Sequence, residues 1–212
     1  RGELPVFAPP QAQAEAVSLA TRVVARLDLK RSIGVVKGKR MDGLRRVGDP
    51  ADLAARYEAQ GADELLMLDV TASLYRQLLA LDYAKTVLQH VTTPVTYGGG
   101  IANFKDFLAT LRAVGEKAAM CTAPFFEKSL IGECAHAFGS QAVVVEVQDR
   151  QGGAYYHAGR QPSSRWKTVD WCREVVKRGA GELLLTSVDR DGMGTGYDLE
   201  LIRTIADQVT VP

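Results

Sequence analysis

The chain has 212 residues, 46% hydrophobic and 24% charged, and its 26 basic side chains nearly balance 25 acidic ones, for a net charge of +1. This composition is that of a globular protein with one large or two small domains. No run approaches the roughly 18 apolar residues of a membrane helix, and the balanced charge gives no support to nucleic-acid binding. Three cysteines without a C-x-x-C pair argue against a disulfide framework and favour a reducing cytoplasm.

The N-terminal residues 1–20 have no long apolar core, so we expect an irregular arm with a short Ala-rich helix rather than a signal peptide. From Thr21 onward, short apolar runs alternate with stretches of helical period, the pattern of βα units on a parallel sheet. The predicted strands are Arg22–Leu27, Glu64–Asp69, Val95–Tyr97, Lys117–Cys121, Ala142–Val147 and Glu182–Ser187. The predicted helices are Pro50–Gln60, Leu78–His90, Phe104–Val114, Glu127–Phe138, Thr168–Arg178 and Leu199–Gln208. The segments after the first and fifth strands, 30–49 and 149–167, are long, and such loops carry function in βα folds.

An internal repeat defines the architecture further. Gly61–Leu66 returns as Gly179–Leu184, and Val91–Pro94 as Val209–Pro212, both 118 residues later, while Val23-Val24 returns as Val143-Val144 after 120. Two copies of a unit of about 120 residues, each with four βα units, make a TIM (βα)8 barrel with a two-fold internal repeat. Because the second copy stops early, we expect residues 21–212 to form a barrel truncated after about six βα units, with units seven and eight missing and a sheet edge left open.

Candidate catalytic groups lie at the carboxyl ends of the strands, where barrels carry their chemistry. Asp28 ends the first strand, and Gln148 is its counterpart 120 residues later. Because side chains alternate along a strand, Arg26 shares a face with Asp28, and Glu146 shares one with Gln148. Asp28 is either a general acid or base at the barrel mouth or a cap of the following loop, and the spacing leaves both open.

Two glycine-rich loops follow strands and offer backbone N–H groups to anions. They are Gly98–Gly100 and Asp189–Gly196. Together they indicate a ligand with two anionic ends, although the glycine triplet alone fits a tight turn as well. Lys37, in the first long loop, is either a cation that folds over such a ligand or a solvated lysine.

The remaining reactive residues give weaker signals. The three histidines, His90, His136 and His157, have no metal-ligand spacing, so we predict no metal and no cofactor. Cys121 faces the mouth by position, or is a small buried hydrophobe. No histidine base adjoins a serine or cysteine, which argues against a nucleophilic triad.

Eight segments in chain order resemble one known family: Arg26–Asp28, Val36–Gly38, Gly48–Pro50, Gly61–Glu64, Leu68–Ser73, Gly98–Ile101, Phe138–Val145 and Leu185–Gly192. From about Thr21 to Pro212 the chain is similar to the cyclase subunit of imidazole glycerol phosphate synthase. That resemblance implies a two-fold-repeated (βα)8 barrel that takes ammonia from a partner glutaminase. The family condenses the ammonia with a bis-phosphorylated ribulosyl aminoimidazole carboxamide precursor, and releases imidazole glycerol phosphate for histidine and the carboxamide ribotide AICAR for purines.

The resemblance also implies residue roles. It makes Asp28 the catalytic acid or base and Lys37 the lysine of a flexible loop. One phosphate site falls on Gly100 and Thr122, with Cys121 at the position of its asparagine, and the other on Asp191 and Gly192. Gly99 and Thr186 are further candidates for substrate or phosphate binding. A charged ring that gates ammonia at the barrel floor falls on Arg22, Glu64, Lys117 and Glu182. Two cations and two anions neutralise one another, so such a ring is tolerable where a single buried charge is not.

The chain departs from the family at several of these positions. The second catalytic aspartate falls on Gln148, which cannot exchange a full proton at neutral pH. Cys121 stands in place of an asparagine, and Arg26 and Glu146 in place of small residues. We predict that Arg26 and Glu146 pair inside the barrel, since each is costly alone. Alternatively, Glu146 is a displaced catalytic carboxylate, one layer too deep.

Three functions remain consistent with the sequence. The first is the ammonia-dependent cyclase, a lyase, in a cytoplasmic heterodimer with a glutaminase and without nucleic-acid or membrane partners. The second is a diverged paralogue that conducts ammonia to a sugar amidotransferase in surface-polysaccharide biosynthesis, which would keep the charged ring and lose a catalytic carboxylate. The third is the sister barrel isomerase of the pathway or an inactive scaffold. The charged ring argues against the isomerase, which uses no ammonia.

Overall fold

The computed structural model describes residues 21–75 and 81–212, so the expected N-terminal arm lies outside the described residues. The strands are β1 (Val24–Lys30), β2 (Gly34–Lys39), β3 (Asp42–Gly48), β4 (Glu64–Asp69), β5 (Val95–Gly98), β6 (Lys117–Met120), β7 (Val143–Arg150), β8 (Gly153–Tyr156), β9 (Gln161–Lys167) and β10 (Glu182–Ser187). The helices are α1 (Pro50–Ala59), α2 (Ala72–Tyr75), α3 (Leu81–Leu88), α4 (Phe104–Val114), α5 (Ala123–Phe126), α6 (Leu130–Phe138), α7 (Thr168–Lys177) and α8 (Leu199–Ala206). None of these helices is long and apolar enough to cross a bilayer.

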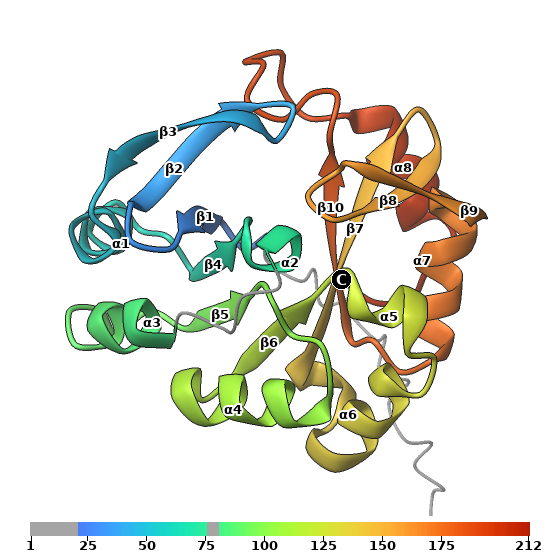
Figure 1. Ribbon diagram of the computed structural model, residues 1–212, viewed down its shortest axis with the longest axis horizontal. Coiled ribbons are helices and arrows are strands. Elements are labelled where there is room, and N and C mark those ends of the chain that lie inside the picture. Colours follow the sequence, from blue (N-terminus) through green and yellow to red (C-terminus); the bar gives the residue numbers. More distant parts are fainter. Residues whose placement is uncertain (1–20, 76–80) are drawn as a thin grey trace, which may run out of the picture.

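The parallel strands form a curved sheet in the order β1-β4-β5-β6-β7-β10, surrounded by helices (Figure 1). This confirms the predicted α/β class with alternating βα units. Over the part of the chain that the structure describes, β10 pairs only with β7, and the end strands β1 and β10 share no backbone ladder. Their side chains nevertheless meet, because Arg22 lies 3.0 Å from Glu182 and Arg26 donates to Thr186 at 2.9 Å. The sheet therefore curves until its two ends face each other.

Both faces of this sheet are buried, as parallel sheets require. In β4, Leu65 and Met67 belong to the cluster under α1 and α3, whereas the alternating Leu66 and Leu68 point into the concave side. A second large cluster around Trp171 packs α4, α6 and α7 against the other half of the sheet. The continuous apolar runs of the sequence are the consequence of this two-sided burial.

The two long segments after β1 and β7 are antiparallel hairpins, β2–β3 and β8–β9, where the sequence indicated only long loops. Their outer strands are polar and largely exposed, so they show no apolar alternation. The first hairpin turns at Arg40 and Met41, both at positive φ (52° and 60°), the backbone of a two-residue type I′ turn. His157 and Ala158 repeat this conformation in the second hairpin, with φ of 51° and 54°.

The elements repeat at the offset seen in the sequence. Helix α1 begins at Pro50 and α7 at Thr168, and β4 begins at Glu64 and β10 at Glu182, each 118 residues apart. The predicted bounds of β4, α4 and β10 are correct. Strand β1 is shifted toward the C-terminus, β7 continues three residues further to Arg150, and α6 starts three residues later than expected. Short helices α2 and α5 were not predicted, and the first residues of the predicted helix Leu78–His90 lie outside the described part.

One surface contact of α1 makes stability depend on pH. Glu58 Oε1 accepts the backbone N–H groups of Thr92 (2.7 Å) and Thr93 (2.8 Å), and both hydroxyls also donate to it. These hydrogen bonds lower the pKa of Glu58 to about 2. Because the folded pKa lies below the unfolded one, the contribution is complete above about pH 5 and is lost as the pH falls toward 2.

We therefore expect Glu58→Gln to unfold at lower denaturant concentration than the unmodified chain at pH 7. The gap should narrow steadily as the pH drops through about 4.5 to 2, because the protonated carboxyl no longer differs in charge from the amide. Urea unfolding at pH 7, 4 and 2.5 measures this. The exposed Glu116 offers a matched control, and a gap that stays constant with pH for Glu58→Gln would contradict the assignment.

Candidate functional site

Four charged side chains form a ring at the amino-terminal ends of the strands. Glu64, Lys117 and Glu182 begin β4, β6 and β10, and Arg22 lies two residues before the start of β1. Each anion contacts both cations: Glu64 lies 2.5 Å from Arg22 and 2.9 Å from Lys117, and Glu182 lies 3.0 Å and 2.8 Å from the same two. Burial lowers the pKa of Lys117, but its hydrogen bonds to Glu182 and Glu64 outweigh burial and raise it above its usual value. The ring is therefore a closed, charge-balanced constriction.

A small apolar layer follows the ring along the strands. It consists of Leu66, Leu68, Ala119 and Val144, with Leu184 packed against it. This layer separates the ring from the polar groups nearer the carboxyl ends.

Beyond the apolar layer, a chain of ionic contacts crosses the concave side of the sheet from β2 to β7. Lys37 Nζ lies 2.6 Å from Asp28 Oδ2, and Asp28 Oδ1 accepts from Arg26 Nε at 2.6 Å. The other end of the Arg26 guanidinium lies 3.3 Å from Glu146 Oε1. The predicted pair of Arg26 and Glu146 is thus present, and one guanidinium joins two buried carboxylates.

These contacts hold Asp28 ionised. Burial raises the pKa of its carboxyl, but the charges of Arg26 and Lys37 and their hydrogen bonds outweigh burial and hold the pKa below its usual range. For Arg26 the same balance applies with opposite sign: burial lowers its pKa, and Asp28 and Glu146 raise it above its usual value. Two cations thus neutralise two anions here, as in the ring.

Gln148 uses both ends of its amide within the protein. Its Nε2 donates to Glu146 Oε2 at 3.0 Å, and its Oε1 accepts the backbone N–H of Gly159 at 2.7 Å. Thr186 Oγ1 donates to Glu146 Oε1 at 3.0 Å while accepting from Arg26. Gln148 and Thr186 therefore support the Glu146 carboxylate.

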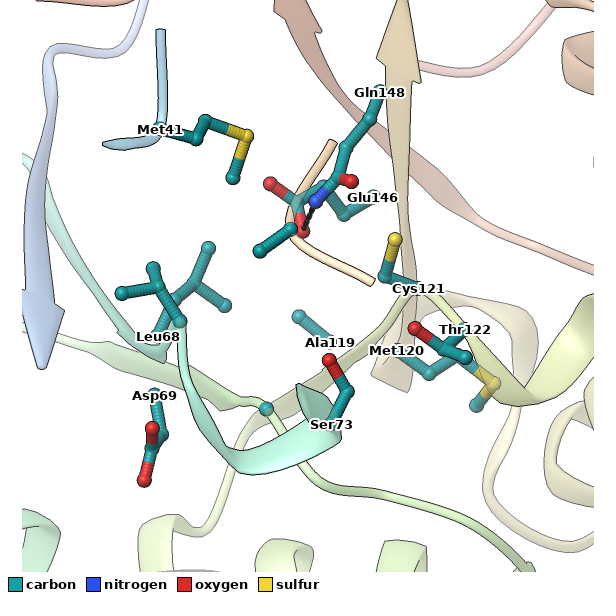
Figure 2. A pocket seen from close by; sticks show the side chains of 13 residues that line it. Met41, Leu68, Asp69, Ser73, Ala119, Met120, Cys121, Thr122, Glu146 and Gln148 are labelled. Atoms are coloured by element: carbon teal, nitrogen blue, oxygen red, sulfur yellow. Dashed lines mark hydrogen bonds between the residues drawn. The ribbon is translucent and has the colours of Figure 1, made fainter. Parts of the chain in front are cut away.

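A small cavity of about 40 Å³ lies beside this network (Figure 2). Its lining includes Met41, Gly99, Cys121, Thr122, Glu146 and Gln148. Burial raises the pKa of the Cys121 thiol well above its usual value, and the charge of Glu146 adds to this. The thiol is therefore protonated at neutral pH, and the cavity has room for only a few water molecules.

The mouth is narrow because both hairpins and the loop after β10 meet over it. Asp191 accepts the backbone N–H of Arg40 on its carbonyl at 2.7 Å and that of Met41 on Oδ2 at 3.2 Å. A Cβ on Gly192, whose φ is 68°, would lie 2.0 Å from the Gly38 carbonyl oxygen, so only glycine permits this approach. These contacts hold the hairpin β2–β3 against the loop after β10.

The predicted site residues divide between two hollows. Gly99, Cys121, Thr122, Glu146 and Gln148 line the small cavity. Thr186, Asp191 and Gly192 line a larger one of about 430 Å³, together with Arg26. Asp28 and Lys37 pair with each other, and neither Asp28, Lys37 nor Gly100 lines either hollow.

The glycine triplet has a packing role that the sequence left open. A Cβ on Gly99, at φ 99°, would lie 2.3 Å from the carbonyl oxygen of Asp69, and one on Gly98 would lie 2.5 Å from that of Ala119. Gly98 and Gly99 therefore permit close contact with the neighbouring strands, and the choice between phosphate binding and a tight turn stays a prediction.

Three residues at the mouth were missed in the sequence: Met41, Ala158 and Gly159. Met41 is buried although it stands in a run of charged residues, KGKRMDG, and this isolated apolar residue was the available signal. Ala158 and Gly159 gave none, because their positions depend on the turn of the second hairpin.

The chain matches a family model described as histidine biosynthesis protein over residues 22–212. It is 41% identical over 200 residues to the imidazole glycerol phosphate synthase subunit HisF of Pyrobaculum aerophilum, covering 92% of this chain and 79% of that protein. The subunits HisF of Gluconacetobacter diazotrophicus and Myxococcus xanthus are 45% and 42% identical, covering 92% of this chain in each case and 76% and 78% of theirs. The chain therefore belongs to the histidine-biosynthesis family and, within it, to the HisF cyclase subunits of imidazole glycerol phosphate synthase.

Proposed function

We propose that this chain is an ammonia-dependent cyclase, a lyase that converts the bis-phosphorylated ribulosyl aminoimidazole carboxamide precursor to imidazole glycerol phosphate and AICAR. The observation that carries the proposal is the alternation of Arg22, Glu64, Lys117 and Glu182 in a closed ring beneath a buried carboxylate network. A neutral ring at the floor with ionised groups at the mouth suits an enzyme fed with a small neutral molecule from one end and with a charged substrate from the other.

In this proposal, the substrate binds at the carboxyl ends of the strands. Asp28 is held ionised and serves as the acid or base of the first strand, while Lys37 supplies a cation from the hairpin β2–β3. The first phosphate group binds near Gly99, Gly100, Cys121 and Thr122, and the second near Thr186, Asp191 and Gly192. Of these, Asp191 and Gly192 also contact the hairpin β2–β3, so phosphate binding there would exchange hairpin contacts for phosphate contacts.

In this proposal, the six parallel strands correspond to six strands of a (βα)8 barrel; they are β1, β4, β5, β6, β7 and β10. The relatives are longer than the chain, which covers 76–79% of them. The gap between the end strands β1 and β10 is where two further strands would close the barrel, and the 430 Å³ hollow lies in that gap. A barrel domain over residues 21–212 preceded by an arm remains a prediction.

The partner that supplies ammonia is a glutaminase bound at the floor of the arc. The relatives are named as subunits, which favours a heterodimer. The Arg22 side chain is 42% exposed, so the ring is accessible from this side. A cytoplasmic location, expected from the cysteine usage, also remains a prediction.

One observation favours the second candidate, a subunit that conducts ammonia to another amidotransferase. The ring is intact, whereas Gln148 has an amide where the family places its second catalytic aspartate. The two candidates differ in what they require, because only the cyclase needs Asp28 and a substrate site at the carboxyl ends of the strands.

Growth tests the proposed function. In a bacterium that lacks its own cyclase subunit, the full chain co-expressed with its glutaminase is expected to restore growth without histidine, and the Asp28→Asn chain is not. If the two chains restore growth equally well, or if neither does at matched protein levels, the cyclase proposal is wrong.

A further inference from the structure

We propose that Glu146 is the carboxylate that contacts the substrate and accepts a proton from it, and that Gln148 is the residue that positions Glu146. This inference rests on the proposed function and adds a residue to its mechanism. In the step, the Glu146 oxygen forms an O–H bond as an N–H bond of the substrate nitrogen derived from ammonia breaks. The electron pair stays on the nitrogen, and the proton returns to water when the mouth opens.

Glu146 has access to the small cavity, and Asp28 does not line it. Glu146 and Gln148 point into it together, as Figure 2 shows, whereas the carboxylate of Asp28 is covered by Arg26 and Lys37. Asp69 also lines the cavity, but it alternates with the inward-facing Leu68, and its side chain points away in the same view. Among the described residues that line the cavity, Glu146 thus presents the acidic group to a ligand.

The Glu146 carboxylate is held by several neighbouring side chains. Thr186 and Gln148 donate to it, and the Cys121 thiol also hydrogen-bonds it. An ionised carboxylate has about four acceptor sites, so these three donors leave about one, with the Arg26 guanidinium 3.3 Å from Oε1. This guanidinium is permanently charged and therefore does not compete for the proton.

Hydrogen bonds at both ends fix the orientation of the Gln148 amide. Its amide cannot take up a proton, and both of its ends are bonded, one to Glu146 and one to Gly159 in the second hairpin. These bonds fix the amide with its N–H group toward the carboxylate. Gln148 therefore aims Glu146 and links its orientation to the position of the hairpin β8–β9.

The test uses two amide-for-acid exchanges. Glu146→Gln keeps the size and removes the base, so kcat of ammonia-dependent turnover is expected to fall about 100-fold or more, with KM changed by less than about 3-fold. Gln148→Glu places a second carboxylate about 3.0 Å from the first, and two such groups resist ionising together. In a plot of its kcat against pH, the fall of kcat on the acidic side (the acid limb) is expected to occur at a pH about one unit higher or more.

The exposed Gln89 provides the matched control, because Gln89→Glu adds the same charge far from the mouth and should leave both kcat and its pH profile unchanged. Thermal unfolding confirms that each variant is folded. If Glu146 has only a structural role, its variants should melt at a lower temperature, while kcat and its pH dependence stay unchanged in the folded protein. That result overturns the proposal.

A measurement without turnover separates this proposal from the proposed function. In protein labelled with ¹³C at the glutamate carboxyls, the resonance missing from Glu146→Gln identifies Glu146, and Glu64 and Glu182 are identified in the same way. Adding the bis-phosphorylated precursor is expected to shift the Glu146 resonance and to leave those of the ring in place. A shift without turnover keeps Glu146 as the carboxylate that contacts the substrate but refutes the cyclase and the proton transfer, whereas turnover without a shift keeps the cyclase and refutes the inference about Glu146.

Discussion

Asp28→Asn is expected to lower ammonia-dependent turnover by about 10²- to 10⁴-fold, the range of a lost general acid or base. The substitution keeps the size of the side chain and one acceptor oxygen for Arg26 or Lys37, but it removes the charge that both cations neutralise. The Asp28 carboxylate is buried and contacts both Arg26 and Lys37. Its loss leaves Lys37 without a neutralising anion, so the contact between the hairpin β2–β3 and β1 is expected to weaken as well. Initial rates with saturating ammonium salt measure the effect.

The matched control for Asp28 is Asp42, an exposed aspartate of the first hairpin that pairs with Arg160 across the mouth. Asp42→Asn should retain turnover within a few-fold, since it loses one surface ion pair. Equal activity of Asp28→Asn and the unmodified protein would show that Asp28 only caps the loop, which is the alternative that the sequence left open.

Glu64→Ala is expected to produce the largest loss of stability, about 3–5 kcal/mol in the free energy of unfolding, as found when one partner of a buried ionic cluster is removed. Glu64 is 5% exposed and accepts from Arg22, Lys117 and Thr96. Without it, the two cations share only Glu182, and the ring carries an uncompensated positive charge. Urea unfolding at pH 7 gives the difference.

The double variant Glu64→Met/Lys117→Met distinguishes charge balance from packing. It removes one anion and one cation and leaves Arg22 paired with Glu182 at 3.0 Å, so most of the lost stability should return. If the double variant is as unstable as Glu64→Ala, the ring is not a charge-balanced unit and the energetic account given for it fails.

The elements that the sequence predicted best are those whose burial is continuous. Strand β4 is buried along its whole length, and α4 has an Asn103 cap that accepts the Asp106 N–H, so both ends of these elements are marked in the sequence. The hairpins were missed because β3 and β9 are polar and exposed, and their pairing depends on turns with positive φ rather than on an apolar pattern.

The candidate site likewise contains contacts that the sequence predicted and contacts that it could not predict. The pair of Arg26 and Glu146 followed from alternation along strands and from the cost of an unpaired buried charge, both of which are local or general. The bond from Gly159 to Gln148 could not be predicted, because it needs the second hairpin to fold back over the strand that precedes it. Contacts between a strand end and a distant turn carry no periodic signal in the sequence.

We propose that these six parallel strands support ammonia-dependent cyclisation with Asp28 at their carboxyl ends. The most direct measurement is turnover of the bis-phosphorylated precursor by the full chain, followed by absorbance, with ammonium salt in place of the glutaminase. We expect a rate of turnover that is proportional to the enzyme concentration and is lost in Asp28→Asn. Binding of the precursor without any turnover at saturating ammonium would contradict the account and point to a subunit that conducts ammonia without transforming this substrate.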